Sequence, residues 1–237
     1  VVYAVGKVGS GTDQVLLRVS GRQAERVYRA SDFTGNVSEM AGFTAGSTSY
    51  IYYVAQLDGN SVLLRTKLSG STEIETVSTW SNIHGLKVSG SYLYFVGDDG
   101  SGSTNVLGYT DGTRTGVVTL GGSAIANATI LTEIAGRLFI KTGATSVLAS
   151  VSGTTGQNVL SNTNTLVSVG QFIEFNRSLV IAADEAGGTA DIELYVISSA
   201  GQVAQTFNIN SSGSSTASDF TIWNEKLYFV ANRGSGR

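Results

Sequence analysis

The sequence predicts an all-β fold, a β-propeller of four-stranded antiparallel blades with five complete repeats plus a partial one, giving five or six blades. Short apolar runs rich in Val, Ile, Tyr and Phe alternate with Gly, Ser and Asn clusters, a pattern typical of strands and turns. The same unit recurs roughly every 44 residues, within the range of about 40–50 residues for propeller blades. The 30 glycines fit tight turns, and amphipathic helical spacing never persists beyond a turn or two.

Each repeat contains four strands, which we call a, b, c and d in chain order. Strand b is the clearest, and its copies are predicted at 2–5, 51–54, 93–96, 138–141, 179–182 and 227–230. Strand c is predicted at 15–18, 62–65, 106–109, 147–150 and 192–195. Strand d is predicted at 26–28, 74–77, 116–119, 158–160 and 205–208. Strand a is predicted at 40–43, 86–88, 130–134, 172–175 and 220–223.

We predict a single propeller domain over residues 1–237. The sequence opens with strands b, c and d and finishes with strands a and b, so the last strand a would complete the first blade. The strand b at 227–230 is then one more than five blades need. Three explanations stay open: this strand is displaced to a rim, the ends form two incomplete blades of a six-bladed ring, or the chain is a fragment of a longer one.

Composition narrows the class of protein. Charged residues make up 14% of the chain and the net charge is −3, whereas about 25% charged residues is usual for soluble domains. Nucleic-acid binding needs clustered Lys and Arg, so we expect no nucleic-acid partner. No apolar run approaches the roughly 20 residues that span a bilayer. The absence of cysteine excludes disulfides and thiolate metal sites. This weakly charged, polar profile predicts an extracellular or cell-surface protein.

One copy of the repeat carries a family resemblance. Strand b at 93–96 and the run Gly108-Tyr109-Thr110-Asp111-Gly112-Thr113-Arg114-Thr115-Gly116 resemble the bacterial propeller repeat known for its ELWxxDGT motif, which occurs in large secreted and surface proteins. TolB-like propellers have similar repeats. The resemblance covers nearly the whole chain as an architectural pattern, although the other copies have Ser-Gly or Ala-Gly where the family has Asp-Gly. It implies an extracytoplasmic location and a binding or scaffolding role, and it supplies no catalytic residue.

A candidate binding face follows from strand order. In a propeller the d-to-a and b-to-c loops lie at one end of the ring, and here they are acidic and include long Ser/Asn loops at 120–128, 162–170 and 210–219. The predicted ligand-binding residues are Asp32, Asp58, Trp80, Asp98, Asp99, Asp184 and Glu185. Trp80 precedes Asn82 in its loop, a pairing that suits stacking against a sugar. The alternative reading is that Asp and Ser are simply good turn formers.

We expect no cofactor. Asp98 with Asp99, and Asp184 with Glu185, could supply oxygen ligands to Ca²⁺, but the alternating acidic spacing of a dedicated calcium loop is missing. His84 is the only histidine, so no histidine cluster can hold a metal and any catalytic triad would depend on this residue.

Recurring aromatic residues of strand b are predicted to pack between blades: Tyr52, Tyr94, Phe95, Tyr228 and Phe229. Trp223, which ends a strand a, is also predicted to lie in the core.

The sequence therefore predicts a non-enzymatic, secreted or cell-surface propeller that acts as a binding or structural module, either in protein–protein interaction or in surface assembly, including self-assembly through terminal strands. One alternative is a lectin-like propeller that binds a cell-surface glycan. Another is a glycan-cleaving five-bladed enzyme, for which Glu133 and Glu174 on strand a would be the paired carboxylates.

Overall fold

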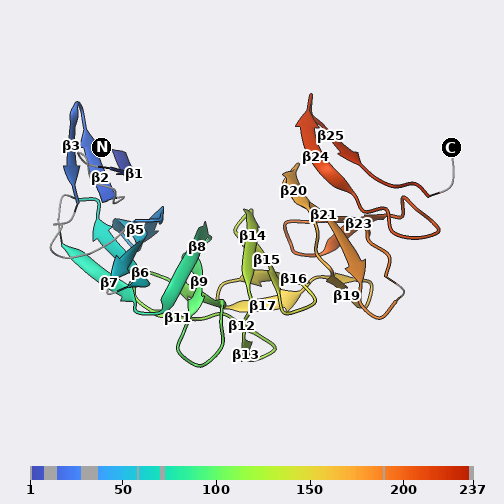
Figure 1. Ribbon diagram of the computed structural model, residues 1–237, viewed down its shortest axis with the longest axis horizontal. Helices are drawn as coiled ribbons and strands as arrows, with labels where there is room; N and C mark the ends of the chain where they lie inside the picture. The colour runs from blue at the N-terminus through green and yellow to red at the C-terminus, as the bar shows by residue number, and fades with distance from the viewer. Residues whose placement is uncertain are drawn as a thin grey trace. The chain divides into compact units, whose positions relative to one another are not determined.

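The computed structural model describes residues 2–7, 15–27, 37–57, 59–69, 73–188 and 190–234. These residues form strands and turns only (Figure 1). None of them belongs to a helix long and apolar enough to cross a membrane. Residue contacts divide the chain into two compact units, Val1–Val118 and Thr119–Arg237. The expectation that residues 1–237 are one domain stays a prediction.

The first unit contains three antiparallel sheets, in which strands adjacent in sequence are also adjacent in the sheet. The first sheet is β1 (Val2–Gly6), β2 (Val15–Ser20) and β3 (Gln23–Arg26). The second is β4 (Glu39–Ala45), β5 (Thr48–Leu57), β6 (Asn60–Lys67) and β7 (Ile74–Ser78). The third is β8 (Ser81–Ser89), β9 (Tyr92–Asp98), β10 (Val106–Thr110) and β11 (Thr115–Val117).

The second unit repeats this plan with additions. Its first sheet contains β12 (Thr119–Leu120), β13 (Ser123–Ala124), β14 (Thr129–Ile134), β15 (Arg137–Thr142), β16 (Val147–Ser152) and β17 (Thr155–Asn158). The next contains β18 (Leu160–Ser161), β19 (Asn164–Val167), β20 (Phe172–Phe175), β21 (Ser178–Glu185), β22 (Glu193–Ile197) and β23 (Val203–Phe207). A hairpin follows, made of β24 (Ser218–Trp223) and β25 (Lys226–Val230).

Consecutive four-stranded antiparallel sheets make the fold an all-β propeller, which confirms the predicted fold class. Within the described residues, four sheets carry strands a to d, the sheet β1–β3 supplies b, c and d, and the hairpin β24–β25 supplies a and b. Every predicted strand b lies within an observed strand: β1, β5, β9, β15, β21 and β25. These strands were predictable because they are short, continuous apolar runs, and those of β5, β9, β15 and β21 are buried on both faces.

Strand d is where the predictions and the structure differ. The strand expected at 116–119 ends at Val117, and Thr119 instead pairs in parallel with Thr155 of β17. The strand expected at 158–160 is broken at Val159, and that expected at 26–28 lies earlier, as β3. The loops expected at 120–128 and 162–170 contain the short strands β13 and β19.

These breaks share one feature. The valine that follows strand d is buried in three of the repeats, as Val27, Val118 and Val159, with exposed fractions of 6%, 0% and 0%. Each donates its N–H to the carbonyl of a strand c leucine, and the N···O distances are 3.1, 2.9 and 3.0 Å. In each of these copies the paired register of strands c and d ends one residue before the valine, while the valine N–H still bonds to strand c.

Each unit has its own apolar core between sheets. In the first unit, Tyr52, Leu63 and Phe95 pack in one cluster between the second and third sheets. In the second unit, Phe139, Leu148 and other side chains of β14–β17 pack against β19–β23. Tyr52, Tyr94 and Phe95 are at most 1% exposed, which confirms the predicted packing between blades for these three.

The hairpin β24–β25 departs from that expectation. Tyr228 and Phe229 were predicted to pack between blades, but they are 46% and 37% exposed, and Trp223, also predicted to be core, is 67% exposed. The prediction was wrong because, in the other sheets, strands c and d and the following sheet cover the residues that correspond to Tyr228 and Phe229. In the described part of the chain, β25 pairs with no strand except β24, although Leu227 packs against the preceding sheet.

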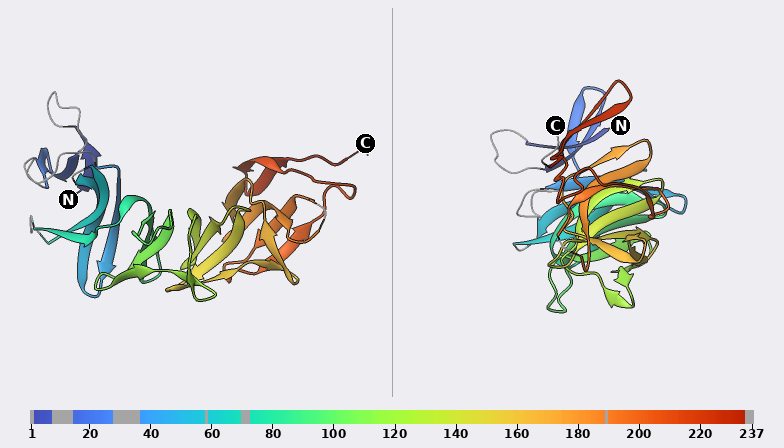
Figure 2. Two further views of the ribbon diagram at one scale, coloured as in Figure 1. Left: turned by 60° about the horizontal axis from the view of Figure 1, so that its bottom comes forward. Right: turned by 90° about the vertical axis from the view of Figure 1, so that its right-hand side faces the viewer.

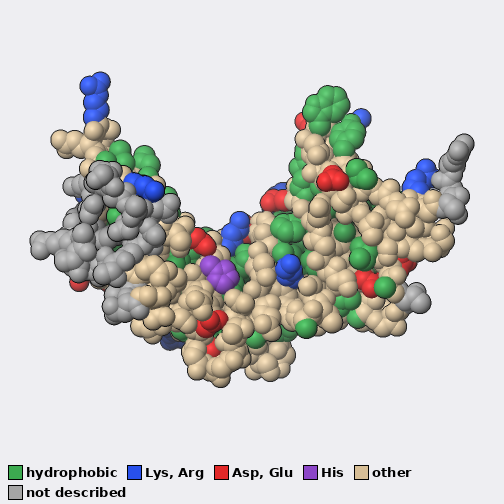
Figure 3. Space-filling view, viewed as in Figure 1, with side chains coloured by type: hydrophobic (Ala, Val, Ile, Leu, Met, Phe, Trp, Pro, Cys, Tyr) green, Lys and Arg blue, Asp and Glu red, His purple; other side chains and the backbone are tan. Residues whose placement is uncertain are grey.

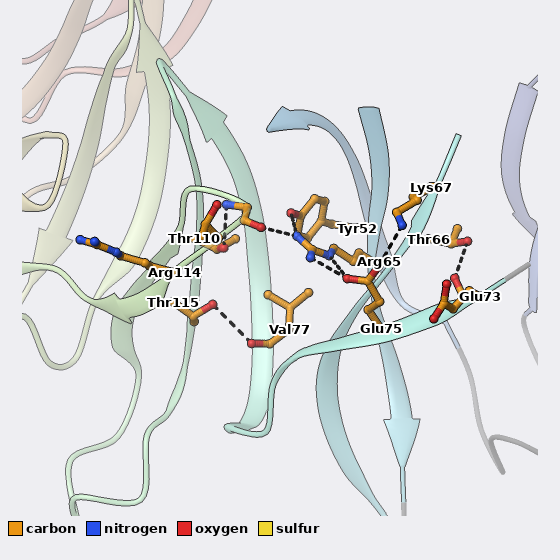
Figure 4. Close-up of polar contacts among 12 residues, drawn as sticks. Tyr52, Arg65, Thr66, Lys67, Glu73, Glu75, Val77, Thr110, Arg114 and Thr115 are labelled. Carbon is orange, nitrogen blue, oxygen red and sulfur yellow. Dashed lines mark hydrogen bonds and ion pairs between the residues drawn. The ribbon is translucent and has the colours of Figure 1, made fainter. Parts of the chain in front are cut away.

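A polar clamp joins two sheets of the first unit (Figure 4). Arg65 on β6 forms bonds to Glu75 on β7, with Nε and Nη2 at 2.8 and 2.6 Å from Oε2. Its Nη1 donates to the hydroxyl of Tyr52 at 3.0 Å and to the carbonyl of Gly112 at 2.5 Å. Gly112 belongs to the turn after β10, so Arg65 connects the second sheet to the third. The guanidinium also lies 4.4 Å from the ring centre of Tyr50.

Candidate functional site

A pocket of about 540 Å³ opens between the sheets β4–β7 and β8–β11 of the first unit. Its walls come from the start of β6, the segment that joins β7 to β8, and the loop between β9 and β10. The lining residues are Asn60, Thr79, Trp80, Ser81, Asp98, Asp99, Gly100, Gly102, Ser103 and Thr104. Three residues of the predicted ligand-binding face, Trp80, Asp98 and Asp99, therefore lie in one pocket.

Trp80 forms the aromatic wall of this pocket. Its half-buried indole stands edge-on to the ring of Phe95, with the ring centres 5.3 Å apart. The backbone N–H of Trp80 donates to Ser78 Oγ at 3.2 Å. Gly108 on β10 leaves space for both rings, because a Cβ at this position would lie 2.6 Å from Phe95 and 2.9 Å from Trp80. Packing fixes one part of the indole while another part faces the pocket.

Asp98 and Asp99 follow one another at the end of β9, and hydrogen bonds hold both carboxylates. Asp98 accepts from Asn82 Nδ2 at 2.5 Å and from the N–H of Asn105 at 2.9 Å. Asp99 Oδ1 accepts from the hydroxyl and the N–H of Ser101 at 2.6 and 2.9 Å. The Asn82 bond chiefly lowers the pKa of Asp98, and the Ser101 hydroxyl chiefly lowers the pKa of Asp99. Both side chains are therefore ionised acceptors at neutral pH.

This arrangement suits a ligand with an apolar face and several hydroxyl groups. Among the described residues, Asp99 Oδ2 has no hydrogen-bond partner, so it can accept a bond from a ligand donor. Asn60 and Thr79, on the opposite wall, add an amide and a hydroxyl. An aromatic ring surrounded by a few placed polar groups is the usual composition of a small-molecule site.

Asp184 and Glu185, at the end of β21, line a different pocket of about 310 Å³ within the second unit. Its lining residues are Asn164, Asp184, Glu185, Gly188, Asp191, Glu193, Tyr195, Thr206 and Asn208. Asp184 accepts from the N–H groups of Glu185 and Asp191 at 2.8 and 3.1 Å. The buried Glu193 accepts from the N–H of Ile209 at 2.8 Å. These carboxylates therefore hold the backbone of neighbouring loops.

The titration of this second pocket follows from its contacts. A hydrogen bond from Ser161, and then one from Asn164, lower the pKa of Glu185. Burial raises the pKa of Asp191, and the charge of Glu193 raises it further. Burial likewise raises the pKa of Tyr195. In the described residues, no group of three or more His, Asp or Glu side chains is placed to hold a metal ion. Calcium at either predicted pair, or no cofactor, stays a prediction.

Those of the remaining predicted residues that the structure describes line neither pocket. Asp32 and Asp58 lie outside the described residues. Glu133 Oε1 accepts from the N–H of Gly136 in its own turn at 2.5 Å, and Glu174 is exposed on β20. No hydrogen bond or ion pair within the described ranges joins these two carboxylates. The exposed His84 holds its Nδ1 2.7 Å from the carbonyl of Asn82.

The predicted ligand-binding residues did not include Asn60 and Thr79 of the first pocket or Glu193 and Tyr195 of the second. A usable signal existed for the first pair. Asn60 belongs to one b-to-c connection, Asp98 to the next, and Thr79 to the d-to-a connection between them. Strand order alone places these three connections at one end of adjacent blades, so they could have been grouped before the structure was known.

No family model and no curated protein matches the chain. Among solved structures, it is similar to a prolyl endopeptidase from a structural and mechanistic analysis of two such enzymes, with a TM-score of 0.50 and 12% sequence identity. The match covers 94% of this chain and 35% of that chain. At this identity the similarity concerns the fold alone, and it supports the propeller.

Proposed function

We propose that this protein is a non-enzymatic propeller binding module, secreted or at the cell surface, and that the pocket at Trp80 holds a saccharide. One observation carries the proposal: Trp80, Asp98 and Asp99 line a single pocket, together with the amide of Asn60 and several serine and threonine hydroxyls. The lectin-like alternative of the sequence analysis is thereby favoured over a purely protein-binding role.

The chemistry of a sugar matches these groups. A pyranose presents a face of C–H groups, which packs on an aromatic ring, and equatorial hydroxyls, which donate to carboxylates. Asp99 is ionised and fixed by Ser101, so it accepts without having to be reorganised. Because hydrogen bonds to a charged partner contribute about 1.5–3 kcal/mol, loss of this carboxylate should weaken binding about tenfold or more.

We also infer kinship with the ELWxxDGT and TolB-like repeats, supported by the way the Asp-Gly-Thr turn is built. Asp111 Oδ1 accepts from the N–H groups of Thr113 and Arg114 at 2.8 and 2.7 Å. Gly112 has φ of +88°, and a Cβ there would collide with Ala45 of the neighbouring sheet. Asp111 and Gly112 of this turn thus each have a structural reason, which fits a repeat selected for blade packing.

The test uses tryptophan fluorescence of the full chain. Trp223→Phe leaves Trp80 as the sole tryptophan, so a spectral change on titration with a panel of neutral and acidic oligosaccharides reports the pocket directly. Calorimetry then gives the affinity of each responding sugar. We expect Trp80→Ala and Asp99→Asn to weaken binding at least tenfold and Trp223→Phe to leave it unchanged. Trp80→Phe keeps an aromatic ring and controls for misfolding.

A panel that produces no fluorescence or heat change would refute the saccharide ligand. Equal affinity in Trp80→Ala and the parent would place the ligand elsewhere. Release of reducing ends from a bound glycan, lost in Glu133→Gln or Glu174→Gln, would instead favour the glycan-cleaving enzyme.

A further inference from the structure

The pocket at Trp80 has a smaller neighbour that shares two of its lining residues. This side pocket has a volume of about 260 Å³. Its lining residues are Thr76, Val77, Ser78, Thr79, Trp80 and Thr115. Thr79 and Trp80 also line the pocket at Trp80, so the two hollows meet along this segment. Both lie at the junction of the second and third sheets, which are side by side in Figure 2, coloured light blue to green.

A β-bulge in β7 shapes the side pocket. The register of β7 on β6 skips Val77, which lies between the paired residues Thr76 and Ser78. The Val77 carbonyl accepts instead from Thr115 Oγ1 on β11 at 3.3 Å, as Figure 4 shows. This bond joins the outer strands of two adjacent sheets. A bulge commonly re-aims side chains beside a functional site, and here it forms the floor of a hollow.

Trp80 is held firmly where the two hollows meet. Ser78, which is 6% exposed, accepts from the backbone N–H of Trp80. The indole atom Cζ3 faces Gly108, where an added Cβ would lie 2.9 Å away, and the ring packs edge-on to Phe95. The aromatic wall is thus in place before any ligand arrives, which reduces the entropy that binding costs.

The side pocket offers neutral hydroxyl groups. Thr76, Thr79 and Thr115 are exposed, and in the part of the chain that the structure describes the hydroxyls of Thr76 and Thr79 have no hydrogen-bond partner. None of the residues that line this pocket is charged, whereas Asp98 and Asp99 line the pocket at Trp80. Uncharged polar side chains and backbone also form most of the surface visible in Figure 3. The two hollows therefore differ in charge and share one aromatic residue.

We propose that the two hollows are consecutive subsites for one ligand, a linear oligosaccharide that passes over Trp80. One sugar unit lies in the pocket at Trp80 and donates to Asp99. The next unit lies in the side pocket, where the hydroxyls of Thr76 and Thr79 can each donate to and accept from it. This inference rests on the saccharide pocket proposed above, and it adds that the ligand is a chain of at least two units and not a single sugar residue.

Occupation of the second subsite should appear as a gain in affinity with chain length. An added sugar unit that realises even half of the contact energy usual per atom for ligands tightens binding about tenfold. Because the hollows meet at a fixed residue, this gain should come with the second unit. Units beyond the third should add little, since they extend past both hollows.

The test is calorimetry of the full chain with β-1,4-linked oligomers of glucose and of N-acetylglucosamine, from one to four units. Thr76→Leu fills the side pocket and removes one of its hydroxyls. It should abolish most of the gain with chain length, while the affinity for a single unit stays within about twofold of the parent. That unchanged affinity also shows that the variant is folded. Thr113→Leu is the matched control, because Thr113 is an exposed threonine outside both hollows, and it should keep the full gain.

A second position in the side pocket gives an independent measurement. Thr115→Leu also fills the hollow and should reduce the gain with chain length. Thr115→Ser retains a hydroxyl that can bond to the Val77 carbonyl, so it should behave like the parent.

The outcomes separate this inference from the saccharide proposal. Equal affinity for one unit and for four, lost in Trp80→Ala, would overturn the second subsite and leave the pocket at Trp80 intact. A gain with chain length that persists in both Thr76→Leu and Thr115→Leu would place the second unit elsewhere and would also overturn it. If no oligomer of either series binds, the chain ligand is wrong, and the wider panel of sugars decides the pocket itself.

Discussion

Removal of the Arg65 guanidinium should destabilise the first unit far more than the removal of a neighbouring cation. Arg65→Met retains the aliphatic stem but loses the bonds to Glu75, to the Tyr52 hydroxyl and to the Gly112 carbonyl. Tyr52 is fully buried, so its hydroxyl would keep no charged partner. The substitution thus breaks a contact within one sheet and a contact between two sheets.

The magnitude follows from the separate contacts. The pair with Glu75 is partly exposed, with side-chain exposures of 17% and 31%, so we assign it about 0.5 kcal/mol. The bonds from the charged group to Tyr52 and to Gly112 are more sheltered, and we assign each about 1.5 kcal/mol. The expected loss in the free energy of unfolding is therefore about 3 kcal/mol, after water recovers part of the total.

Lys67→Met is the matched control. Lys67 lies on the same strand, 3.8 Å from Glu75, and is 38% exposed, so its loss should cost about 0.5 kcal/mol or less. Urea denaturation followed by circular dichroism measures both variants. Arg65→Met should remain costly in a Glu75→Gln background, because most of its contribution comes from Tyr52 and Gly112. If Arg65→Met and Lys67→Met are equally stable, the clamp between sheets does not contribute as argued.

Three further predictions concern backbone and titration. Gly112→Ala should lower the free energy of unfolding, measured by urea denaturation, more than Gly136→Ala does. Both glycines have positive φ, at +88° and +83°, but of the two only Gly112 has a neighbouring sheet that an added Cβ would strike. Equal losses of stability in the two variants would contradict the collision. Asp191→Asn should raise the free energy of unfolding at pH 7, because burial and the nearby Glu193 raise the pKa of Asp191 and so disfavour its charged form. The gain should vanish below about pH 4, where Asp191 is protonated in the unfolded chain as well. A gain that does not change with pH would contradict this. Burial raises the pKa of Tyr94 to about 12 and also raises the pKa values of Tyr52 and Tyr195. The free energy of unfolding should therefore fall as the pH rises above about 10, because the unfolded chain releases protons that the folded chain retains. If phenolate absorbance shows that all tyrosines titrate together while the chain is still folded, this prediction is wrong.

Much of the fold was predictable because strand b is recognisable without its neighbours. The run at 93–96 is apolar on both faces, and a sheet covered on both sides needs such a run. The end of strand d was less predictable, because Val118 and Val159 are of a residue type that favours strands, yet the regular pairing with strand c ends one residue before each of them. The residue type alone therefore does not show where the pairing of this strand stops.

The candidate site was predictable in part for a related reason. Trp80, Asp98 and Asp99 share a pocket because strand order brings their connections to one end of adjacent blades. Asp184 and Glu185 follow the same rule but line another pocket, where neighbouring backbone N–H groups and polar side chains occupy much of their bonding capacity. Sequence position predicted where acidic side chains gather, and only the contacts distinguish a carboxylate free for a ligand from one that holds a loop.

The two tryptophans illustrate why residue type alone cannot assign such roles. Trp80 was considered for exposure and Trp223 for the core, yet Trp80 is half-buried against Phe95 and Trp223 is 67% exposed. The difference lies in their neighbours: Trp80 is flanked by complete sheets, whereas Trp223 sits on a hairpin with one open edge. A fixed indole beside ionised carboxylates suits a small polar ligand. The exposure of Trp223 by itself assigns it no role, so the surroundings of a tryptophan, and not its presence in the sequence, support a binding proposal.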